Sequence, residues 1–530
     1  MFEKVARRNF LSTAGAGAAG SALALTALSA TTETRATPAE GGELDVRSFG
    51  AKGDGQTVDT PAINRAIDAV AASGGGVVHF PAGSYLCFSI HLKSNVTLNL
   101  GPGSTIVAAD TLPQGSDGYD AGEPNAWDQY QDFGHSHWHN SLLWGEDLAN
   151  VAIVGTGLIW GKGLSRGSGD TALGPRVGDK SISLKNCRNV LLRDFSVLHG
   201  GHFAILATGV DNLSIDNLKI DTNRDGIDVD CCRNVRISNC SVNSPWDDAI
   251  CLKSSYGLGF VRATDHVTIT NCYVAGGYRE GTMLDATFKP IGPEDKAPRN
   301  GRIKLGTESN GGFGNITISN CVMEDCRGLA LETVDGGLLE DVSINNITMR
   351  GITDVPMFIR LGSRMRGPKG TPVGELRRVN ISDLVVSDCD SRQATIISGI
   401  PGHSIEDLKL SNIYVLHRGG GTKQDQSIEP AELENVYPDP NRFGPMPAHG
   451  FFIRHVKGLD MHDVEIKSLK EDFRPGFVLQ DVDGADFTRI KLAKSTNVPS
   501  IALNNVKNFS VTQSRPVPDT RLESVQQTVL

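Results

Sequence analysis

The chain has 530 residues, of which 39% are apolar and 21% charged, a composition typical of a globular rather than a disordered protein. Its formal net charge of −10 argues against general nucleic-acid binding. A polyanionic ligand would therefore need basic groups gathered locally.

The N-terminus has the pattern of an export signal. Arg7-Arg8-Asn9-Phe10-Leu11 precedes a weakly apolar, Ala- and Gly-rich stretch that ends near Ala30. This pattern predicts a twin-arginine-type signal over residues 1–36, followed by a linker over residues 37–44. We therefore expect an exported bacterial protein, periplasmic or secreted, with no membrane association once mature. An Ala-rich membrane anchor is the alternative, and no later run is long enough to span a bilayer.

A single helix is predicted near the start of the mature chain. Thr60-Pro61 is typical of a helix start, and Ile63, Ile67 and Val70 follow at helical spacing as far as about Ala72. A glycine run then ends the helix, and residues 77–81 predict a strand. Because the first coil of a solenoid would otherwise expose an apolar face, we interpret this helix as a cap.

A repeated strand motif dominates the rest of the chain. Its tightest copies lie roughly 22–26 residues apart, the length of one solenoid coil. The copies begin at Asn95, Asn150, Asn189, Asn212, Asn234, His266, Asn315, Asp341, Val379 and Ile405, with weaker ones near Gly458, Gly484 and Val506. The pattern predicts an all-β parallel β-helix over residues 45–515, followed by a C-terminal tail over residues 516–530. No helix recurs in each period and the period is too short for a blade, which disfavours a leucine-rich repeat or a β-propeller.

Two residue types recur at fixed places in this repeat. The alternating Val and Ile residues are expected to point inward, and the Asn residues to stack as ladders at the turns. Cys240, Cys272 and Cys321 each follow an Asn, which indicates buried packing positions. Disulfide pairing at Cys231-Cys232 or between Cys321 and Cys326 stays open.

Four insertions interrupt the repeat and are candidates for function, which lies on loops in solenoid proteins. Residues 112–140 are rich in aromatic residues and carry the alternating histidines His135, His137 and His139. These histidines fit a metal cluster, sugar stacking or loop packing. Residues 276–300 and 419–448 form two further insertions, and residues 360–369 form a basic one.

Two acidic clusters stand one coil apart. Asp225, Asp228 and Asp230 precede a predicted strand over residues 235–240, and Asp247-Asp248 follow it. Stacked on neighbouring coils, Asp225, Asp247 and Asp248 would share one patch of surface. Like charges held close shift each other's pKa, so one carboxyl can stay protonated while another is ionised, as cleavage of a glycosidic bond requires. Aspartates that only fill turns are the alternative.

Asn223-Arg224-Asp225-Gly226-Ile227-Asp228, followed by Asp247-Asp248, resembles the two acidic motifs of glycoside hydrolase family 28, the polygalacturonase group. With the cap and repeats, the resemblance covers roughly residues 43–515. It implies a right-handed parallel β-helix and inverting hydrolysis of pectic glycosides without a metal or other cofactor. It further implies that Asp247 is the general acid, and that Asp225 and Asp248 hold and deprotonate the water. We expect substrate contacts from a wider set: Asn223, Asp228, His202, Lys253, Arg302, Lys304 and Arg360.

Two family motifs do not match cleanly. Asn300-Gly301-Arg302 stands where the family has Gly-His-Gly, and a literal Arg302-Ile303-Lys304 lies one coil too early once the repeats are aligned. Ala330 and Glu332 occupy the coil where the family holds a galacturonate carboxylate. We therefore expect a monomeric, exo-acting or side-chain-specific enzyme for a pectic poly- or oligosaccharide. A β-helix lyase, an adhesin, or a glycosidase for another sugar such as rhamnose are the alternatives.

Overall fold

The computed structural model describes residues 42–110, 118–132, 134–167, 176–292, 299–390, 393–493 and 498–530. The predicted export signal and most of the predicted linker lie outside the described residues. Residues 40–530 form one compact unit. None of the helices in the described part of the chain combines the length and the hydropathy needed to cross a bilayer.

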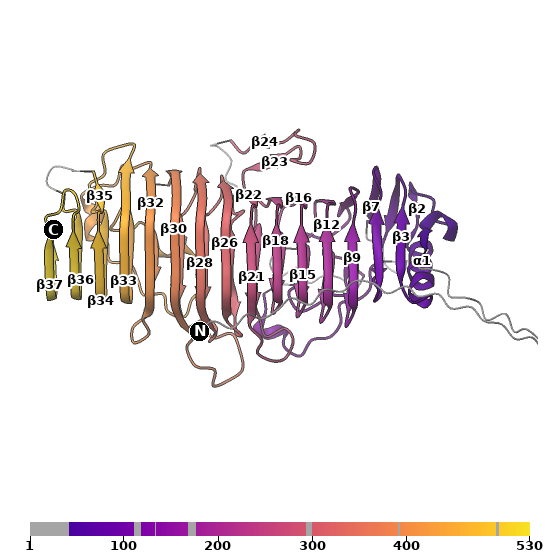
Figure 1. The fold of residues 1–530 in the computed structure, drawn as a ribbon, viewed down its shortest axis with the longest axis horizontal. Coiled ribbons are helices and arrows are strands. Elements are labelled where there is room, and N and C mark those ends of the chain that lie inside the picture. The colour runs from indigo at the N-terminus through magenta and orange to yellow at the C-terminus, as the bar shows by residue number, and fades with distance from the viewer. Residues whose placement is uncertain are drawn as a thin grey trace, which may run out of the picture. The chain divides into compact units, whose positions relative to one another are not determined.

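The unit is a right-handed parallel β-helix, as predicted. Figure 1 shows the strands side by side in chain order, from the indigo cap to the yellow C-terminal strand. Each coil contributes strands to three parallel sheets, because each strand pairs with its counterpart on the coil before and on the coil after.

The first sheet carries several of the predicted site residues. It contains β5 (Ile90–His91), β8 (Ser141–Glu146), β11 (Lys180–Lys185), β14 (Phe203–Thr208), β17 (Asp225–Asp230), β20 (Ile250–Ser254), β25 (Ile303–Ser309), β27 (Leu329–Thr333), β29 (Met357–Leu361) and β31 (Thr395–Ser398).

The second sheet holds the sequence repeat. It contains β1 (Glu43–Asp45), β3 (Gly76–Phe80), β6 (Val96–Leu100), β9 (Ala149–Val154), β12 (Arg188–Arg193), β15 (Asp211–Asp216), β18 (Arg233–Ser238), β21 (Thr264–Thr270), β26 (Phe313–Glu324), β28 (Leu338–Arg350), β30 (Glu375–Cys389), β32 (Ile405–His417), β33 (Phe451–Ser468), β34 (Phe477–Thr488) and β36 (Ile501–Thr512).

The third sheet is made of shorter strands. From β26 onward, single long strands run through both the second and the third sheet. It contains β2 (Asp54–Val58), β4 (Gly83–Cys87), β7 (Ser104–Ala108), β10 (Leu158–Trp160), β13 (Ser196–Leu198), β16 (Lys219–Asp221), β19 (Ser241–Asn243), β22 (Tyr273–Ala275) and β35 (Lys491–Leu492). An insertion adds the hairpin β23 (Tyr278–Glu280) and β24 (Lys289–Pro290), and four short 3-10 helices span Val46–Phe49, Asp128–Tyr130, Gln424–Ser427 and Pro440–Phe443.

Burial along the repeat follows the alternation in the sequence. Val190, Leu213, Val235 and Val267 are in register on successive coils, and each is at most 3% exposed. The residues between them face outward. Because the period of a strand is two, one stack of β-branched and leucine side chains fills the interior from coil to coil.

The predicted asparagine ladder is confirmed. Asn95, Asn150, Asn189, Asn212 and Asn234 all have a left-handed backbone, with φ between 55° and 62°. Each side-chain amide from Asn150 onward donates to the amide oxygen of the preceding rung, over 2.7–3.2 Å. Asn tolerates this conformation better than most residues, which explains its recurrence at this turn.

Both ends of the stack are covered. Helix α1 (Thr60–Ala72) buries Ile63, Ile67 and Val70 at 0–1% exposure, so the predicted cap is confirmed. At the other end, part of the segment predicted as a tail is β37 (Thr520–Val529), which pairs antiparallel with β36. An antiparallel strand gives the last coil a hydrogen-bonding partner without starting another coil.

The ten cysteines are free and buried. Cys240, Cys272 and Cys321 belong to the interior packing, as predicted.

Candidate active site

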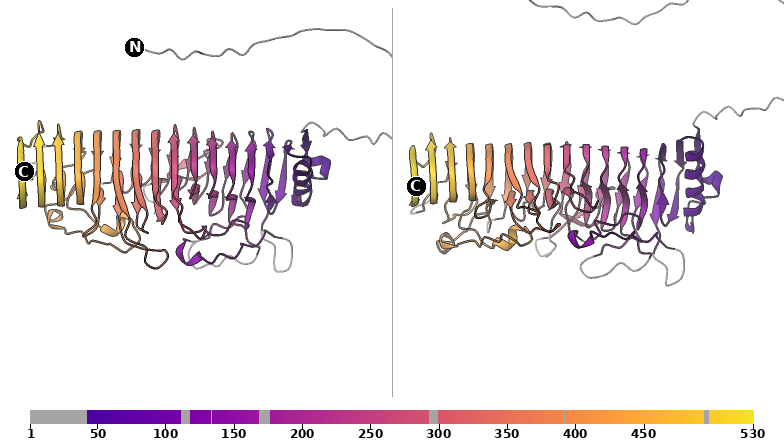
Figure 2. Two further views of the ribbon diagram at one scale, coloured as in Figure 1. Left: turned by 60° about the horizontal axis from the view of Figure 1, so that its bottom comes forward. Right: turned by 90° about the horizontal axis from the view of Figure 1, so that it is seen from below.

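A polar pocket of about 240 Å³ opens on the first sheet where β17, β20 and β25 begin. Figure 2 shows the long insertions drawn in purple and in orange projecting from one side of the coils. Two of them reach the pocket, which is lined by Asp132, His135, His202, Arg224, Asp225, Asp247, Asp248, Lys253, Lys304 and Tyr437.

The three predicted catalytic carboxylates meet in this pocket. Asp225 is the first residue of β17, and Asp247-Asp248 lie just before β20 on the next coil. The register Ile227 to Ile250 stacks the two strands. As a result, one carboxylate oxygen from each of the three residues lies within 4.8 Å of the others.

Burial and mutual repulsion raise the pKa of two of the three carboxyls. Burial raises the pKa of Asp225 well above its usual value, and the nearby charges of Asp228 and Asp247 add to the rise. Burial and Asp248 also raise the pKa of Asp247, against the opposing charge of Arg224. The pocket can therefore hold a protonated carboxyl at a pH where an ordinary aspartate is ionised.

Asp248 is the ionised member of the trio. Its Oδ1 accepts from Arg302 Nε at 2.6 Å, and its Oδ2 lies 3.0 Å from Lys304 Nζ. Burial alone would raise the pKa of Asp248, but the charges of Arg302 and Lys304 outweigh it and hold this pKa well below the usual range.

The structure places Arg302-Ile303-Lys304 on β25, directly after the coil of Asp247-Asp248, because Ile303 pairs with Ile250. This register agrees with the prediction that the motif lies one coil before the family position. Lys304 lines the pocket, whereas the guanidinium of Arg302 is committed to Asp248 and only 3% exposed. The two residues therefore set the charge of a carboxylate that is predicted to be catalytic.

A second buried network supports the floor of the pocket. Lys253 Nζ lies 3.5 Å from Glu308 Oε2 and 3.7 Å from Asp228 Oδ2. His135 Nε2 lies 3.2 Å from the same Asp228 oxygen. Asp228 is fully buried and does not line the pocket. Its predicted role as a substrate contact is therefore replaced by that of a counterion for Lys253 and His135.

The histidines of the first insertion diverge. His135 faces Asp228, His137 Nε2 lies 3.3 Å from Asp128, and His139 Nε2 lies 2.8 Å from Glu146. Each ring engages a different carboxylate, so the alternating pattern serves loop packing and, through His135, the pocket floor.

His202 and Asn223 lie at the pocket or beside it. His202 lines the pocket, and its Nδ1–H donates to the carbonyl oxygen of Gly167 at 2.9 Å. Burial, with the neighbouring charge of Arg224, lowers the pKa of His202 to about 2, so the ring is neutral. With its amide oxygen turned toward Arg166, Asn223 accepts from that guanidinium at 2.6 and 2.9 Å.

Arg360 lies away from the pocket, contrary to its predicted role as a substrate contact. It is on β29, 1% exposed, and its guanidinium donates to Ser398 and to the carbonyl oxygens of Gly399, Glu432 and Leu433. These bonds anchor the insertion over residues 419–448. Two other arginines of the basic segment turn toward the pocket wall instead, where Arg364 and Arg366 pair with Asp335, Asp132 and Glu308.

Tyr437, Asp132 and Arg166 were missed because each lies in an insertion. Tyr437 lies 5.9 Å from the Lys304 ammonium, measured to its ring centre, although it is distant from the carboxylates in the sequence. Only the aromatic content of the first insertion and the length of the later one hinted at such contacts. The sequence repeat does not mark residues in a loop that folds back over a coil.

Comparisons with known proteins agree with this geometry. A family model described as "Glycosyl hydrolases family 28" matches residues 128–279, across the acidic motifs. A second, "Rhamnogalacturonase A/epimerase, pectate lyase-like", matches residues 44–187, across the cap and first coils. Over residues 128–279 the chain is therefore similar to glycoside hydrolase family 28.

Two curated relatives and one solved structure are similar to this chain. A probable polygalacturonase of Vitis vinifera is 25% identical over 394 residues, covering 69% of this chain and 73% of the relative. An exo-poly-alpha-D-galacturonosidase of Dickeya chrysanthemi is 35% identical over 136 residues, 26% of this chain and 22% of the relative. A solved family 28 exopolygalacturonase of Yersinia enterocolitica superposes with a TM-score of 0.61 at 19% identity, over 83% of this chain and 77% of that one, and supports the fold.

Proposed function

We propose that this chain is an inverting hydrolase of pectic poly- or oligosaccharides that acts on chain ends or side chains. In this mechanism Asp247 donates its proton to the glycosidic oxygen as the bond breaks. Asp248 and Asp225 hold the attacking water, and Asp248 accepts its proton. The observation that carries the proposal is the opposite pKa shift of two adjacent carboxyls, Asp247 upward and Asp248 downward.

The strong pairing of Asp248 makes it a weak base, which suits a late proton transfer. Water becomes strongly acidic only as its oxygen bonds to the oxocarbenium-like carbon, so an already ionised carboxylate can orient it first and accept the proton afterwards. Asp225, whose pKa is raised, supplies the second contact to this water.

The carboxylate spacing does not by itself select inversion. The three oxygens lie within 4.8 Å, below the roughly 6.5–9.5 Å expected for inverting enzymes. Inversion therefore rests on the resemblance to the family. NMR of the first-formed sugar decides it, because net retention of the anomeric configuration would overturn the proposal.

Action at chain ends is supported by the walls of the pocket. Asp132 and His135 from one insertion and Tyr437 from another line it beside the carboxylates. The wall is cross-linked by an ion pair of 2.5 Å between Arg366 and Asp132. Two of the relatives are named for exo action on galacturonate chains. A pocket walled by insertions accepts a chain end more readily than the middle of a polymer.

A lyase that uses a cation at the acidic cluster is the competing function. Three carboxylates within 4.8 Å could attract a cation. However, both oxygens of Asp248 are engaged by Arg302 and Lys304, and Asp247 is paired with Arg224. These charges compete with a cation for the same oxygens, which favours hydrolysis.

Product analysis on polygalacturonate, on branched pectin and on their oligosaccharides tests the proposed function. Slow release of one small sugar, or action on branched pectin alone, is expected. Rapid viscosity loss with a ladder of oligomers would refute end-directed action. An unsaturated product that absorbs in the ultraviolet and disappears with a chelator would establish the lyase instead.

A further inference from the structure

The expected general acid is held in an ion pair. Arg224 Nη2 donates to Asp247 Oδ2 at 2.6 Å, and the two side chains are 25% and 23% exposed. The pair is accessible from the pocket, which both residues line.

This pair opposes catalysis as it stands. A general acid must carry a proton, and the Arg224 charge lowers the pKa of Asp247 against the effects of burial and of Asp248. When Asp247 takes up a proton, the guanidinium keeps its charge and loses its counterion. Arg224 Nε is already buried without a hydrogen-bond partner. Protonation of the acid therefore leaves a cation in the pocket that requires another anion.

Other cations around the pocket are paired with carboxylates other than the expected proton donor. Lys304 and Arg302 hold Asp248, and Lys253 lies against Glu308 and Asp228. The pKa of Glu308 is held well below its usual value, since Lys253 and His135 outweigh its burial. Among the pocket-lining cations that the structure describes, Arg224 is the one whose ion-pair partner must be protonated before the glycosidic bond can break.

The backbone around Arg224 is fixed. Trp246 N–H, just before Asp247, donates to the carbonyl oxygen of Asn223 at 2.8 Å. The Asn223 side chain faces the exposed guanidinium of Arg166. Arg224 and Asp247 are thereby held on adjacent coils, and only their side-chain ends are available to exchange partners.

We propose that Arg224 binds the carboxylate of a uronic acid residue at the cleavage site, and that this carboxylate replaces Asp247 as its partner. The inference rests on the proposed function and names the charge its substrate carries. A guanidinium binds a carboxylate with two parallel hydrogen bonds, which the single contact to Asp247 leaves available. Glu332, fully buried beside Lys304 on the next coil, supplies no positive charge for a uronate there, which leaves Arg224 as the available partner.

The exchange couples binding to catalysis. Released from Arg224, Asp247 takes a proton from solvent and donates it to the glycosidic oxygen as the carbon–oxygen bond breaks. Water forms the new bond to that carbon and gives its proton to Asp248, which returns it to solvent. A neutral sugar offers no anion for Arg224, so Asp247 stays ionised and the sugar is cleaved poorly.

The kinetic test compares trigalacturonate with its methyl ester, in wild type and in Arg224→Gln. On trigalacturonate we expect kcat/KM to fall about 10- to 100-fold, mainly through KM, as for loss of one or two charge-assisted hydrogen bonds. On the ester we expect less than about a threefold change at acid pH. The basic limb of kcat/KM on the ester should move to higher pH, because Asp247 no longer faces the Arg224 charge. Equal losses on both substrates, or an unmoved basic limb, would overturn the proposal.

Two variants act as controls for this test. Arg193→Gln removes an exposed arginine that pairs with Asp194, and should leave both substrates unaffected. Arg224→Lys keeps the charge and should restore part of the loss on trigalacturonate. Thermal melts of each variant check that the fold is intact.

A binding measurement separates failure of this inference from failure of the proposed function. By calorimetry, Asp247→Asn should bind trigalacturonate at least about threefold more tightly than wild type, because Arg224 has lost its competing anion. Arg224→Gln in the Asp247→Asn background should abolish the gain. If Asp247→Asn and the double variant bind trigalacturonate equally tightly, the charge exchange is wrong, whatever substrate the wild type hydrolyses. If wild type cleaves no pectic substrate but the binding gain is seen, the reaction is misassigned and the uronate site stands.

Discussion

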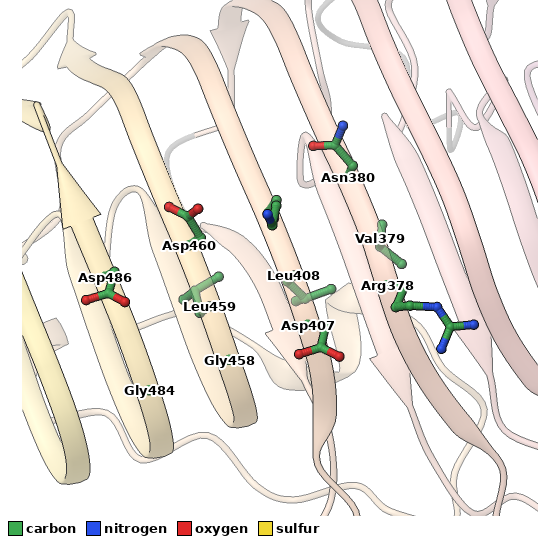
Figure 3. Close-up of a pocket in the computed structure, with 11 residues that line it drawn as sticks. Arg378, Val379, Asn380, Asp407, Leu408, Gly458, Leu459, Asp460, Gly484 and Asp486 are labelled. Atoms are coloured by element: carbon green, nitrogen blue, oxygen red, sulfur yellow. The ribbon is translucent and has the colours of Figure 1, made fainter. Parts of the chain in front are cut away.

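The active-site pocket and a groove on the outer face of the later coils differ in how they hold charge. The groove, about 550 Å³, is larger and runs over β30, β32, β33 and β34. Figure 3 shows Asp407, Asp460 and Asp486 on neighbouring strands. Arg378 and Asn380 lie together on the strand next to Asp407, and Gly458 and Gly484 lie on the strands of Asp460 and Asp486. These charges lie on the outward rows of the sheet, and Arg378 pairs with Asp341 at the surface.

In the pocket, by contrast, Asp225, Asp248, Lys253 and Lys304 are 1–4% exposed. A charge removed from water interacts strongly with its neighbours, whereas exposed pairs are worth little. We therefore expect the reaction in the smaller pocket with buried charges and not in the larger groove with exposed charges. The four changes below test this difference, from the largest expected effect to the smallest.

Asp247→Asn should lower kcat by about 100-fold or more, because an amide cannot donate the proton that a carboxylic acid gives to the leaving group. The matched change in the groove is Asp460→Asn, which should leave kcat unchanged. Steady-state kinetics on the best pectic substrate, with circular dichroism for folding, measure both. Near-normal turnover by a folded Asp247→Asn would show that the acid is a different residue.

Lys304→Gln should move the acid limb of the pH–rate profile upward by about one unit or more. Lys304 lowers the pKa of Asp248, so without it Asp248 becomes protonated at a higher pH and the activity is lost earlier as the pH falls. Lys409→Gln in the groove should leave the profile in place. An unshifted acid limb in Lys304→Gln would mean that Asp248 does not limit the rate at low pH.

Asp225→Asn should abolish most activity yet stabilise the fold near neutral pH. Its pKa is raised on folding, so its ionisation costs stability at any pH above the pKa of the unfolded chain. The gain should be absent below about pH 4 and grow as the pH rises. Denaturant unfolding at several pH values measures it, and a loss of stability at pH 7 would contradict the assignment.

Gly458→Asn should change stability least, with a gain of about 0.5 kcal/mol. Gly458 has φ 75° and follows Asp407 at the ladder position, where an added Cβ would lie 3.0 Å from Asp407 Oδ1. Asn accepts this conformation and can donate to that oxygen, as the earlier rungs do. Gly458→Val, a β-branched residue at positive φ, should instead destabilise the fold. Thermal unfolding of both variants is the measurement. Equal melting temperatures would show that the ladder position does not favour Asn over Val.

The sequence by itself determined the features that repeat with the coil. The alternation over residues 235–240 predicted the buried strand, and the spacing of Asp225 and Asp247-Asp248 predicted that they would stack. Both predictions follow from the repeat. Every coil has nearly the same path, so residues one coil apart in sequence lie next to each other in the stack. The cap helix followed in the same way from Ile63, Ile67 and Val70.

The tertiary structure decided what the insertions do. It turned Arg360 into an anchor for residues 419–448, brought Tyr437 against Lys304, and paired Arg224 with Asp247. It also withdrew Asp228 from the pocket surface into the network of Lys253 and His135. Loops have no period that links residue number to position, and the partner of a buried charge depends on which side chains packing brings within reach. These contacts could therefore be found only once the coils and their insertions were folded together.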